Sequence, residues 1–439
     1  MRHDDDEAGS TSFGTLLFRY RSAAGLTQRA LADLSTISVR AIRDLEQRRA
    51  RPREDTVRLI SDALRLGRQV RADLERSTDH GRGNRPLRHD YDAALAAPPA
   101  GLTAMVGRDA EAATLTAELV GATHRLVTIL GLPGVGKSRL AVEVARTLHG
   151  RQRMPVLWLA APEAGSGVAE STVRDERLAA LVRDAGAALF GQIDGARAIG
   201  ELAELVGGRD TLLVLDGVTA HGLRTLELLG LLRDCPRLRI MVTAPRQTGL
   251  AGERPFLLGP LTLPDTDAGE RRGAASVRLF TDHLRRVRPD HRLAATDGPV
   301  LAEICRLLDG LPPALAQAAS WLAVYDLEPL RDILFTDPFA VLDPVLADRL
   351  GDWVSGLPAE QRAVLDRLRE LGEVSLDDIV AATGRSLPEV GRLLRDLLLC
   401  GVIRTRHAGG QSRFQVLSLV GAVACRLAAP VPFPTTTAL

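Results

Sequence analysis

The sequence predicts a multidomain protein with an all-α head, an α/β core on a parallel sheet, a helical domain and a last domain of helices and a hairpin. Short amphipathic helical runs follow one another up to residue 76, whereas residues 103–265 alternate apolar, β-branched runs with helical runs. This alternation is typical of a parallel, doubly wound sheet. The length of 439 residues allows two to four domains.

The head, residues 11–76, is predicted to be a helix-turn-helix bundle. Thr27 and Ser38 stand directly before helical runs and are good N-cap residues, so they are predicted to begin the second and third helices. A turn at 35–38 joins these helices, and we expect Leu34 to face inward. Two helices joined by a short turn inside a small bundle are the plan of many DNA-binding domains.

The head resembles the XRE family of phage-repressor and Cro-like domains through the stretch GLTQRALADLSTISVRAIRDLEQRRARPREDTVRLISDAL. The resemblance implies a double-stranded DNA partner contacted by Gln28, Ser38, Val39, Arg40 and Arg43, to which we add Thr27 and Arg48. Residues 13–76 carry 14 arginines and 8 acidic residues, a net charge of +6 that suits phosphate binding. The alternative is a solvated bundle without a DNA role. Reading two half-sites would require a dimer or a larger assembly.

The core is organised around the stretch RLVTILGLPGVGKSRLAVEVARTLHG, residues 125–150. It contains G-x-x-x-x-G-K-S between a predicted strand and a predicted helix, which is the pattern of a phosphate-binding P-loop. Lys137 is the only lysine of the chain; its ammonium would contact the β- and γ-phosphates, and Ser138 would bind Mg²⁺. The predicted nucleotide-binding residues are Gly131, Pro133, Gly134, Val135, Gly136, Lys137, Ser138 and Arg139. The alternative is a glycine-rich turn before an ordinary helix.

Two further predicted strands end in candidate site residues. The run DTLLVLDG places Asp216 at a strand end, where a carboxylate can hold Mg²⁺, and we predict Lys137 and Asp216 as the catalytic pair. The run RLRIMVTAPR brings Thr243 to the same edge of the sheet. A buried strand can also end in aspartate without any functional reason. ATP or ADP is the expected nucleotide, because a guanine-reading N-K-x-D motif needs another lysine.

The core and the region after it resemble STAND ATPases of the NB-ARC type. The resemblance rests on AMVGRDAEAATLTAEL before the P-loop and on EICRLLDGLPPALAQAA after the core. It implies nucleotide contacts from Val106, Gly107, Arg108, Thr243, Arg246 and Pro312. Two departures from the family pattern bear on hydrolysis: Gly217 stands where relatives have an acid or asparagine, and Arg246 comes one position late. We therefore expect at most a slow ATPase.

Two regulatory domains are predicted after the core, which spans 103–265. Residues 266–345 are expected to form a helical domain, and residues 346–428 resemble a winged helix with three helices and a hairpin that turns at 409–410. In the STAND family this domain closes the ADP-bound core, although a winged helix can also bind DNA. The histidine of the NB-ARC Met-His-Asp motif, which contacts ADP, is missing at 416–418.

The remaining segments predict neither a metal centre of zinc type nor a membrane span. Residues 77–102 are rich in glycine, proline and charge and are expected to be a flexible linker, and the tail 429–439 is expected to be disordered. No apolar run approaches 18 residues, the acidic N-terminus is unlike a signal peptide, and the four cysteines are widely spaced. These features predict a cytoplasmic protein with reduced cysteines.

Together the resemblances imply an ATP/ADP-switched transcriptional regulator, similar to actinobacterial regulators of specialised metabolism. With ADP the winged helix would close the core, and with ATP the core would open and self-associate, presenting several DNA-binding heads. Two alternatives stay open. One is a signalling ATPase of the STAND type, for example in defence, and the other is a repressor whose core no longer binds nucleotide.

Overall fold

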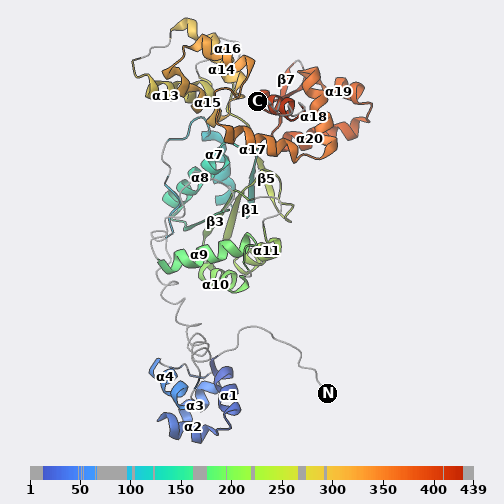
Figure 1. The fold of residues 1–439 in the computed structure, drawn as a ribbon. Coiled ribbons are helices and arrows are strands. Elements are labelled where there is room, and N and C mark those ends of the chain that lie inside the picture. The colour runs from blue at the N-terminus through green and yellow to red at the C-terminus, as the bar shows by residue number, and fades with distance from the viewer. Residues whose placement is uncertain are drawn as a thin grey trace, which may run out of the picture. The chain divides into compact units, whose positions relative to one another are not determined.

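The computed structural model describes residues 13–47, 49–50, 52, 54–64, 66, 96–100, 104–121, 124–161, 176–193, 195–218, 223–264, 273–290, 294–408 and 410–428. Within these ranges, no helix combines the length and the apolar character needed to cross a membrane. The chain divides into two compact units, residues 1–91 and 92–439, and each is described by itself (Figure 1). Arg48, the predicted linker before residue 96 and the tail 429–439 lie outside the described residues.

The described part of the first unit contains four helices. They are α1 (Phe13–Ala23), α2 (Gln28–Ser35), α3 (Val39–Glu46) and α4 (Glu54–Ala63). Thr27 and Ser38 cap α2 and α3, since their hydroxyl oxygens accept hydrogen bonds from Ala30 N at 3.1 Å and from Ala41 N at 3.2 Å. The predicted starts of both helices are therefore confirmed.

A small apolar core holds these helices together. Each helix contributes one completely buried side chain to it: Leu17, Leu31, Ile42 and Ile60. The prediction that Leu34 faces inward is wrong, because its side chain is 60% exposed. The buried stripe of α2 passes through Leu31, Ala32 and Ser35, so Leu34 lies beyond the edge of that stripe.

The second unit is built on a parallel five-stranded sheet, as the sequence predicts. The strands are β1 (Leu126–Leu130), β2 (Val156–Ala160), β3 (Thr211–Asp216), β4 (Leu238–Thr243) and β5 (Arg254–Leu257). Their order across the sheet is β2-β3-β4-β1-β5, and every pairing is parallel. The apolar runs predict the first four strands. They do not predict β5, a partly exposed edge strand that contains an arginine and a proline.

Helices pack against this sheet. They are α7 (Asp109–Val120), α8 (Lys137–Gln152), α9 (Glu176–Leu189), α10 (Ala196–Val206) and α11 (Thr225–Asp234). Figure 1 shows α7 and α8 beside the sheet. Leu140, Val144 and Leu148 of α8 are completely buried at the spacing of one helical face. This packing holds the N-terminus of α8 at the carboxyl end of β1, directly after the glycine-rich loop.

The packed part of the second unit begins before residue 103. Ala96 is completely buried, and its carbonyl oxygen accepts a 2.9 Å hydrogen bond from Val156 N at the start of β2. The last residues of the predicted linker 77–102 thus include buried positions, namely Ala96, Pro98 and Pro99. Small alanine and proline side chains pack here without the periodicity that would have marked them in the sequence.

Two further modules follow the sheet. The helical module contains α13 (Ala275–Val287), α14 (Gly298–Leu307), α15 (Pro312–Ser320) and α16 (Leu327–Thr336). The C-terminal module contains α17 (Pro344–Ser355), α18 (Ala359–Leu371), α19 (Leu376–Thr383), α20 (Leu387–Leu399), α21 (Ser418–Ala428), β6 (Val374–Ser375), β7 (Ile403–Ala408) and β8 (Gln411–Val416). β7 and β8 form the predicted hairpin, and the order of this antiparallel sheet is β6-β8-β7.

The parallel sheet and both modules share one apolar core. The same cluster of buried side chains contains Val127 of β1, Leu140 of α8, Leu315 of α15 and Leu394 of α20. Figure 1 shows α17 next to the end of the sheet that faces the two modules. Because burial stabilises by about 25 cal/mol per Å² of apolar surface, moving the modules away would cost free energy. The second unit is thus packed as one body in this conformation.

Candidate nucleotide site and DNA-binding surface

The loop between β1 and α8 has the backbone that its glycines predict. Gly131, Gly134 and Gly136 have φ angles of +147°, +82° and +103°, values that residues with a side chain rarely adopt. A Cβ built on Gly136 meets no atom within 4 Å, so space is open beside the first turn of α8. Free N–H groups at a helix N-terminus attract anions. The other predicted residues around the loop are buried (Arg108, Val135) or half-buried (Val106, Gly107, Pro133, Arg139).

Lys137 folds back onto its own loop. Its Nζ donates hydrogen bonds to the carbonyl oxygens of Gly131 at 2.8 Å and of Leu132 at 3.1 Å. Burial lowers the pKa of Lys137 to about 8, while the carboxylate of Asp216 acts in the opposite direction. A phosphate group in the loop would compete with these carbonyls for the ammonium, and the flexible lysine stem allows that exchange without a backbone movement.

A cluster of two hydroxyls and a carboxylate lies at the carboxyl ends of the strands. Asp216 Oδ1 accepts hydrogen bonds from Ser138 Oγ and from Thr243 Oγ1, each at 2.6 Å. Asp216 is completely buried, and its Oδ2 atom has no hydrogen-bond partner. A buried carboxylate oxygen without a partner is costly, and magnesium prefers oxygen ligands of this kind. The residues present therefore fit a magnesium ion held by Ser138 and Asp216.

Gly217, the residue after Asp216, has a conformational reason to be glycine. Its φ angle is +78°, and its N–H donates to Thr243 Oγ1 at 2.8 Å. Because the same hydroxyl donates to Asp216, Thr243 ties the end of β4 to the end of β3. Glycine adopts this left-handed backbone without the steric cost that most residues with a Cβ meet there. The cluster thus orients Asp216 without a second acid at the adjacent position.

Arg108 joins the segment before α7 to the loop. Its guanidinium donates to the carbonyl oxygens of Gly259 at 2.5 Å and of Val135 at 3.5 Å, and it also forms an ion pair with Glu111 in the first turn of α7. A Cβ on Gly107 would lie 2.1 Å from the Cβ of Ala275, so this glycine permits the close approach of α13. Arg108 therefore holds the parts of the site together through internal contacts.

The helical module and the C-terminal module both pack closely against the loop. A Cβ on Gly134 would lie 3.0 Å from Pro313 Cγ of α15 and 3.3 Å from Leu346 Cδ1 of α17. A Cβ on Gly401, which follows α20, would lie 3.0 Å from the backbone nitrogen of Leu132. The glycines that shape the loop thus also admit its neighbours, and any group bound in the loop has to share this space with the two modules.

Pro312 and Arg246, which were expected to contact the nucleotide, have other neighbours in the structure. Pro312 opens α15, but the proline that reaches the loop is the next one, Pro313. Arg246 donates to the carbonyl oxygen of Gly356 at 2.8 Å, and its guanidinium lies over the Trp353 ring, 4.6 Å from the centroid. In this conformation Arg246 therefore joins the end of β4 to the α17 region.

Asp309 is a buried carboxylate that sequence reasoning missed. It lies three residues before Pro312, has a φ angle of +53° and is 1% exposed. Its two oxygens accept hydrogen bonds from the backbone N–H groups of Ser418 and Leu419, both at 2.8 Å, at the start of α21. Burial raises the pKa of Asp309 to about 6, although these hydrogen bonds and Arg404 oppose the shift. We call this contact between the helical and C-terminal modules the Asp309 latch.

The face of α3 carries the exposed residues of the predicted DNA-binding set. The Arg40 side chain is 92% exposed, and Arg43 is exposed as well. Gln28 donates to Glu46 at 2.7 Å, and Glu46 also pairs with Arg21 at 2.6 Å. This network fixes the start of α2 against the end of α3. The remaining members are the exposed caps Thr27 and Ser38 and the half-buried Val39.

The head and about half of the chain are similar to known proteins. Residues 12–74 match a family model described as a helix-turn-helix domain. The chain is 34% identical over 226 residues to an uncharacterized protein of Mycobacterium tuberculosis, covering 50% of this chain and 51% of that protein. It is 32% identical over 203 residues to another protein of that organism, provisionally named an HTH-type transcriptional regulator, covering 45% of this chain and 20% of that protein. The matches thus span about half and about one fifth of the relatives' lengths.

Solved structures offer distant likenesses to the chain. One is the replication initiator DnaA bound to AMPPCP and single-stranded DNA, with 13% identity, a TM-score of 0.28 and coverage of 68% of this chain and 90% of that chain. Another is NtrX from Brucella abortus in complex with ATP, with 15% identity, a TM-score of 0.26 and coverage of 75% of each chain. At these TM-scores neither structure identifies a ligand for this protein, so the site rests on its own geometry.

Proposed function

We propose that the protein is a DNA-binding transcriptional regulator whose α/β core binds ATP or ADP. The observation that carries the DNA-binding part is α3, whose Arg40 and Arg43 are exposed on a domain that matches a helix-turn-helix family. The provisional name of one relative agrees with this role. In such domains the second helix of the motif enters the major groove, where arginine side chains contact guanine or phosphate.

The core contributes the nucleotide site in this proposal. The N–H groups of the loop would hold phosphate oxygens, and Lys137 would turn from its two carbonyl partners toward the phosphates. Ser138 and Asp216 would hold magnesium, and Thr243 keeps the carboxylate oriented. Bound magnesium would neutralise part of the phosphate charge. With glycine at position 217, the site favours binding over fast hydrolysis.

The closed arrangement of the modules supports a switch. Pro313 and Leu346 share space with the loop, while the Asp309 latch and the contact between Arg246 and Trp353 hold the modules in place. A ligand shifts such an equilibrium only through different affinities for the two states. We infer that ADP is compatible with the closed state and that a γ-phosphate favours an open one. The open core would then self-associate and bring several heads to one DNA.

The decisive experiment is a footprint of the full-length protein on the DNA upstream of its own gene and of neighbouring genes. It compares ADP with a non-hydrolysable ATP analogue. We expect protection that changes in extent or affinity between the two nucleotides. Absence of protection in both states would contradict DNA binding. Identical protection in both, in a protein that binds no nucleotide on titration, would indicate a repressor with an inactive core. Sustained ATP turnover that survives Asp216→Ala would refute the site.

A further inference from the structure

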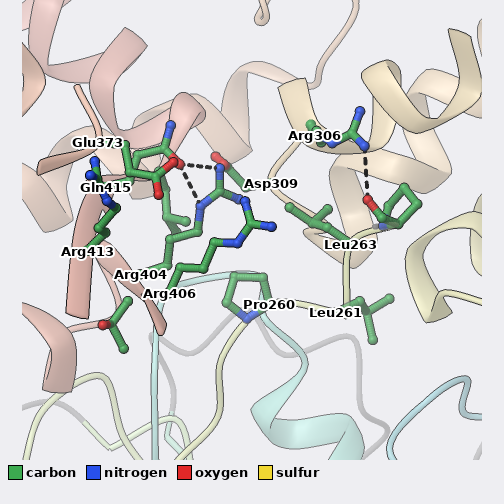
Figure 2. A pocket seen from close by; sticks show the side chains of 13 residues that line it. Pro260, Leu261, Leu263, Arg306, Asp309, Glu373, Arg404, Arg406, Arg413 and Gln415 are labelled. Carbon is green, nitrogen blue, oxygen red and sulfur yellow. Dashed lines mark hydrogen bonds between the residues drawn. The ribbon is translucent and has the colours of Figure 1, made fainter. Parts of the chain in front are cut away.

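A cavity of about 630 Å³ lies between the helical module and the β7–β8 hairpin, and no residue of the phosphate-binding loop lines it. Its polar lining contains Arg306, Asp309, Glu373, Arg404, Arg406 and Arg413. Figure 2 shows these side chains around the cavity, with Pro260, Leu261 and Leu263 forming an apolar wall. We call it the arginine cavity.

The charge of the arginine cavity is unbalanced. Four arginines and two carboxylates line it, a net charge of +2. One carboxylate, Asp309, already accepts two backbone hydrogen bonds from α21. Two of the arginines are held in place, because Arg404 donates to Gln415 at 2.7 and 3.0 Å and Arg306 donates to a carbonyl oxygen at 3.0 Å. The cavity therefore presents fixed positive charge before any ligand binds.

The other two arginines occupy opposed positions on the hairpin. Arg406 of β7 stands directly opposite Arg413 of β8. Neither guanidinium group has a hydrogen bond or ion pair with the described residues, although the pKa of Asp378 is lowered by hydrogen bonds from Ser375 and, less strongly, by the Arg413 charge. Like charges at directly opposed positions destabilise a strand pair. Arg404 lies two residues from Arg406, hence on the same face of β7, and Figure 2 shows both side chains reaching into the cavity. An anion bound beside these guanidinium groups would offset the like charges of the arginines that line the cavity.

We propose that the arginine cavity binds a small phosphorylated organic molecule. Guanidinium groups match phosphate oxygens with paired, charge-assisted hydrogen bonds, which Arg406 and Arg413 would supply beside Arg404. The organic part would rest on Leu261 and Leu263. The segment of those leucines lies across the cavity from the hairpin (Figure 2), and a volume of about 630 Å³ suits a small molecule better than a duplex. Binding here does not depend on a nucleotide in the loop.

The occupant would also reach the Asp309 latch, because Asp309 is one wall of the cavity. A ligand that bridges the hairpin and the helical module contacts the two parts which the latch joins. If the proposed switch operates, this cavity is where a second molecule would act on the closed state. That consequence rests on the proposed function, whereas the binding of a phosphorylated molecule does not.

The test is a calorimetric titration of phenyl phosphate and of inorganic phosphate into the full-length protein. We expect phenyl phosphate to bind more tightly, because its ring buries apolar surface. Arg406→Ala with Arg413→Ala should weaken binding at least about 10-fold. The matched control is Arg367→Ala with Arg395→Ala, two exposed arginines of the same module that pair with nearby acids on their own helices. The affinity of this control variant for phenyl phosphate should equal that of the wild type.

Thermal unfolding separates binding from a folding defect. Without ligand, the Arg406→Ala, Arg413→Ala variant should be at least as stable as the wild type, because two opposed like charges are gone, and phenyl phosphate should no longer raise its unfolding temperature. Lys137→Ala should retain phenyl phosphate binding. The proposal is overturned if binding survives the loss of Arg406 and Arg413 or disappears with Lys137. It is also overturned if these two arginines carry duplex DNA binding in a chain with Arg40→Ala and Arg43→Ala.

Discussion

The face of α3 and the loop at 131–138 are both proposed to meet phosphate groups, but the protein surrounds them differently. On α3 the Arg40 side chain is 92% exposed, and its ion pair with Asp44 on the same helix is a loose 3.9 Å contact. The buried side chains of this helix, Ile42 and Leu45, face the core. In the loop, two backbone carbonyls hold Lys137, and Pro313 and Leu346 stand against the glycine backbone. The arginines of α3 are therefore accessible to a binding partner, whereas the loop makes contacts with other parts of its own chain.

This difference indicates where control acts. Glu46 accepts hydrogen bonds from both Gln28 and Arg21, which positions the helices of the head and leaves the arginines of α3 exposed. In the core, a ligand must displace the carbonyl partners of Lys137. The apparent affinity of a ligand falls by the fraction of protein that is competent to bind. Nucleotide binding should therefore be the regulated step, and the DNA affinity of a single head should stay constant.

The largest effect should come from removing the two exposed arginines of α3. Arg40→Ala with Arg43→Ala is expected to weaken duplex DNA binding at least about 30-fold, since each contact contributes roughly 1–3 kcal/mol. The affinity for ADP should stay unchanged. Mobility-shift titration at fixed salt measures the first quantity, and calorimetry the second. The control is Arg58→Ala, an exposed arginine of α4 that pairs with Asp55. An equal loss in this control would remove α3 from its proposed role.

The next effect should be confined to the loop. Lys137→Ala is expected to lower the affinity for ADP by about 10- to 100-fold, because a charge-assisted hydrogen bond contributes roughly 1.5–3 kcal/mol. Lys137→Arg should not restore it, since a planar guanidinium is wider than an ammonium. Arg151→Ala, at the exposed end of α8, is the matched control. If the Lys137 variants lose DNA binding in the absence of nucleotide, the loop and the face of α3 do not act as separate surfaces.

The strands and the loop could be predicted because their signals are local. Each of the first four strands is a run of mainly apolar residues, and the glycine spacing of the loop lies within eight positions. β5 lacks such a run, since Arg254 and Pro255 begin it and its pairing with β1 decides its conformation. Leu34 lies at a spacing that fits the buried face of α2, but which residues of that face become buried depends on the helices that pack against it.

The contacts that close the candidate site join distant positions, and no local pattern could predict them. Which of two adjacent prolines reaches Gly134 depends on the rotation of α15 about its axis. Asp309 meets the start of α21 only because both modules pack on one core. Arg246 was expected at a phosphate because of its place after β4, and the aromatic ring of Trp353 provides a partner that the sequence does not reveal.

The pH dependence of the Asp309 latch gives a smaller effect. The folded-state pKa of Asp309, about 6, lies above its ordinary value of 3.8, so the folded state binds the proton more tightly. Stability gained by protonation is present at low pH and is lost as the pH rises through 6. Between pH 5 and pH 7, the wild type should lose about 1 kcal/mol relative to Asp309→Asn. Urea unfolding of both proteins at the two pH values measures this, and a difference independent of pH would show that burial does not raise the pKa of Asp309.

The smallest expected effect tests whether Ser38 contacts DNA or only caps α3. Ser38→Ala should cost the helix about 1 kcal/mol, because the Ala41 N–H loses its acceptor, and hydrogen exchange at that amide should become faster. Ser38→Asn restores a cap without the hydroxyl. If it restores both slow exchange and DNA affinity, Ser38 acts on DNA only through the helix. If it restores slow exchange alone, the Ser38 hydroxyl itself contacts DNA. The exposed DNA-binding surface then includes the N-cap of α3 as well as its arginines.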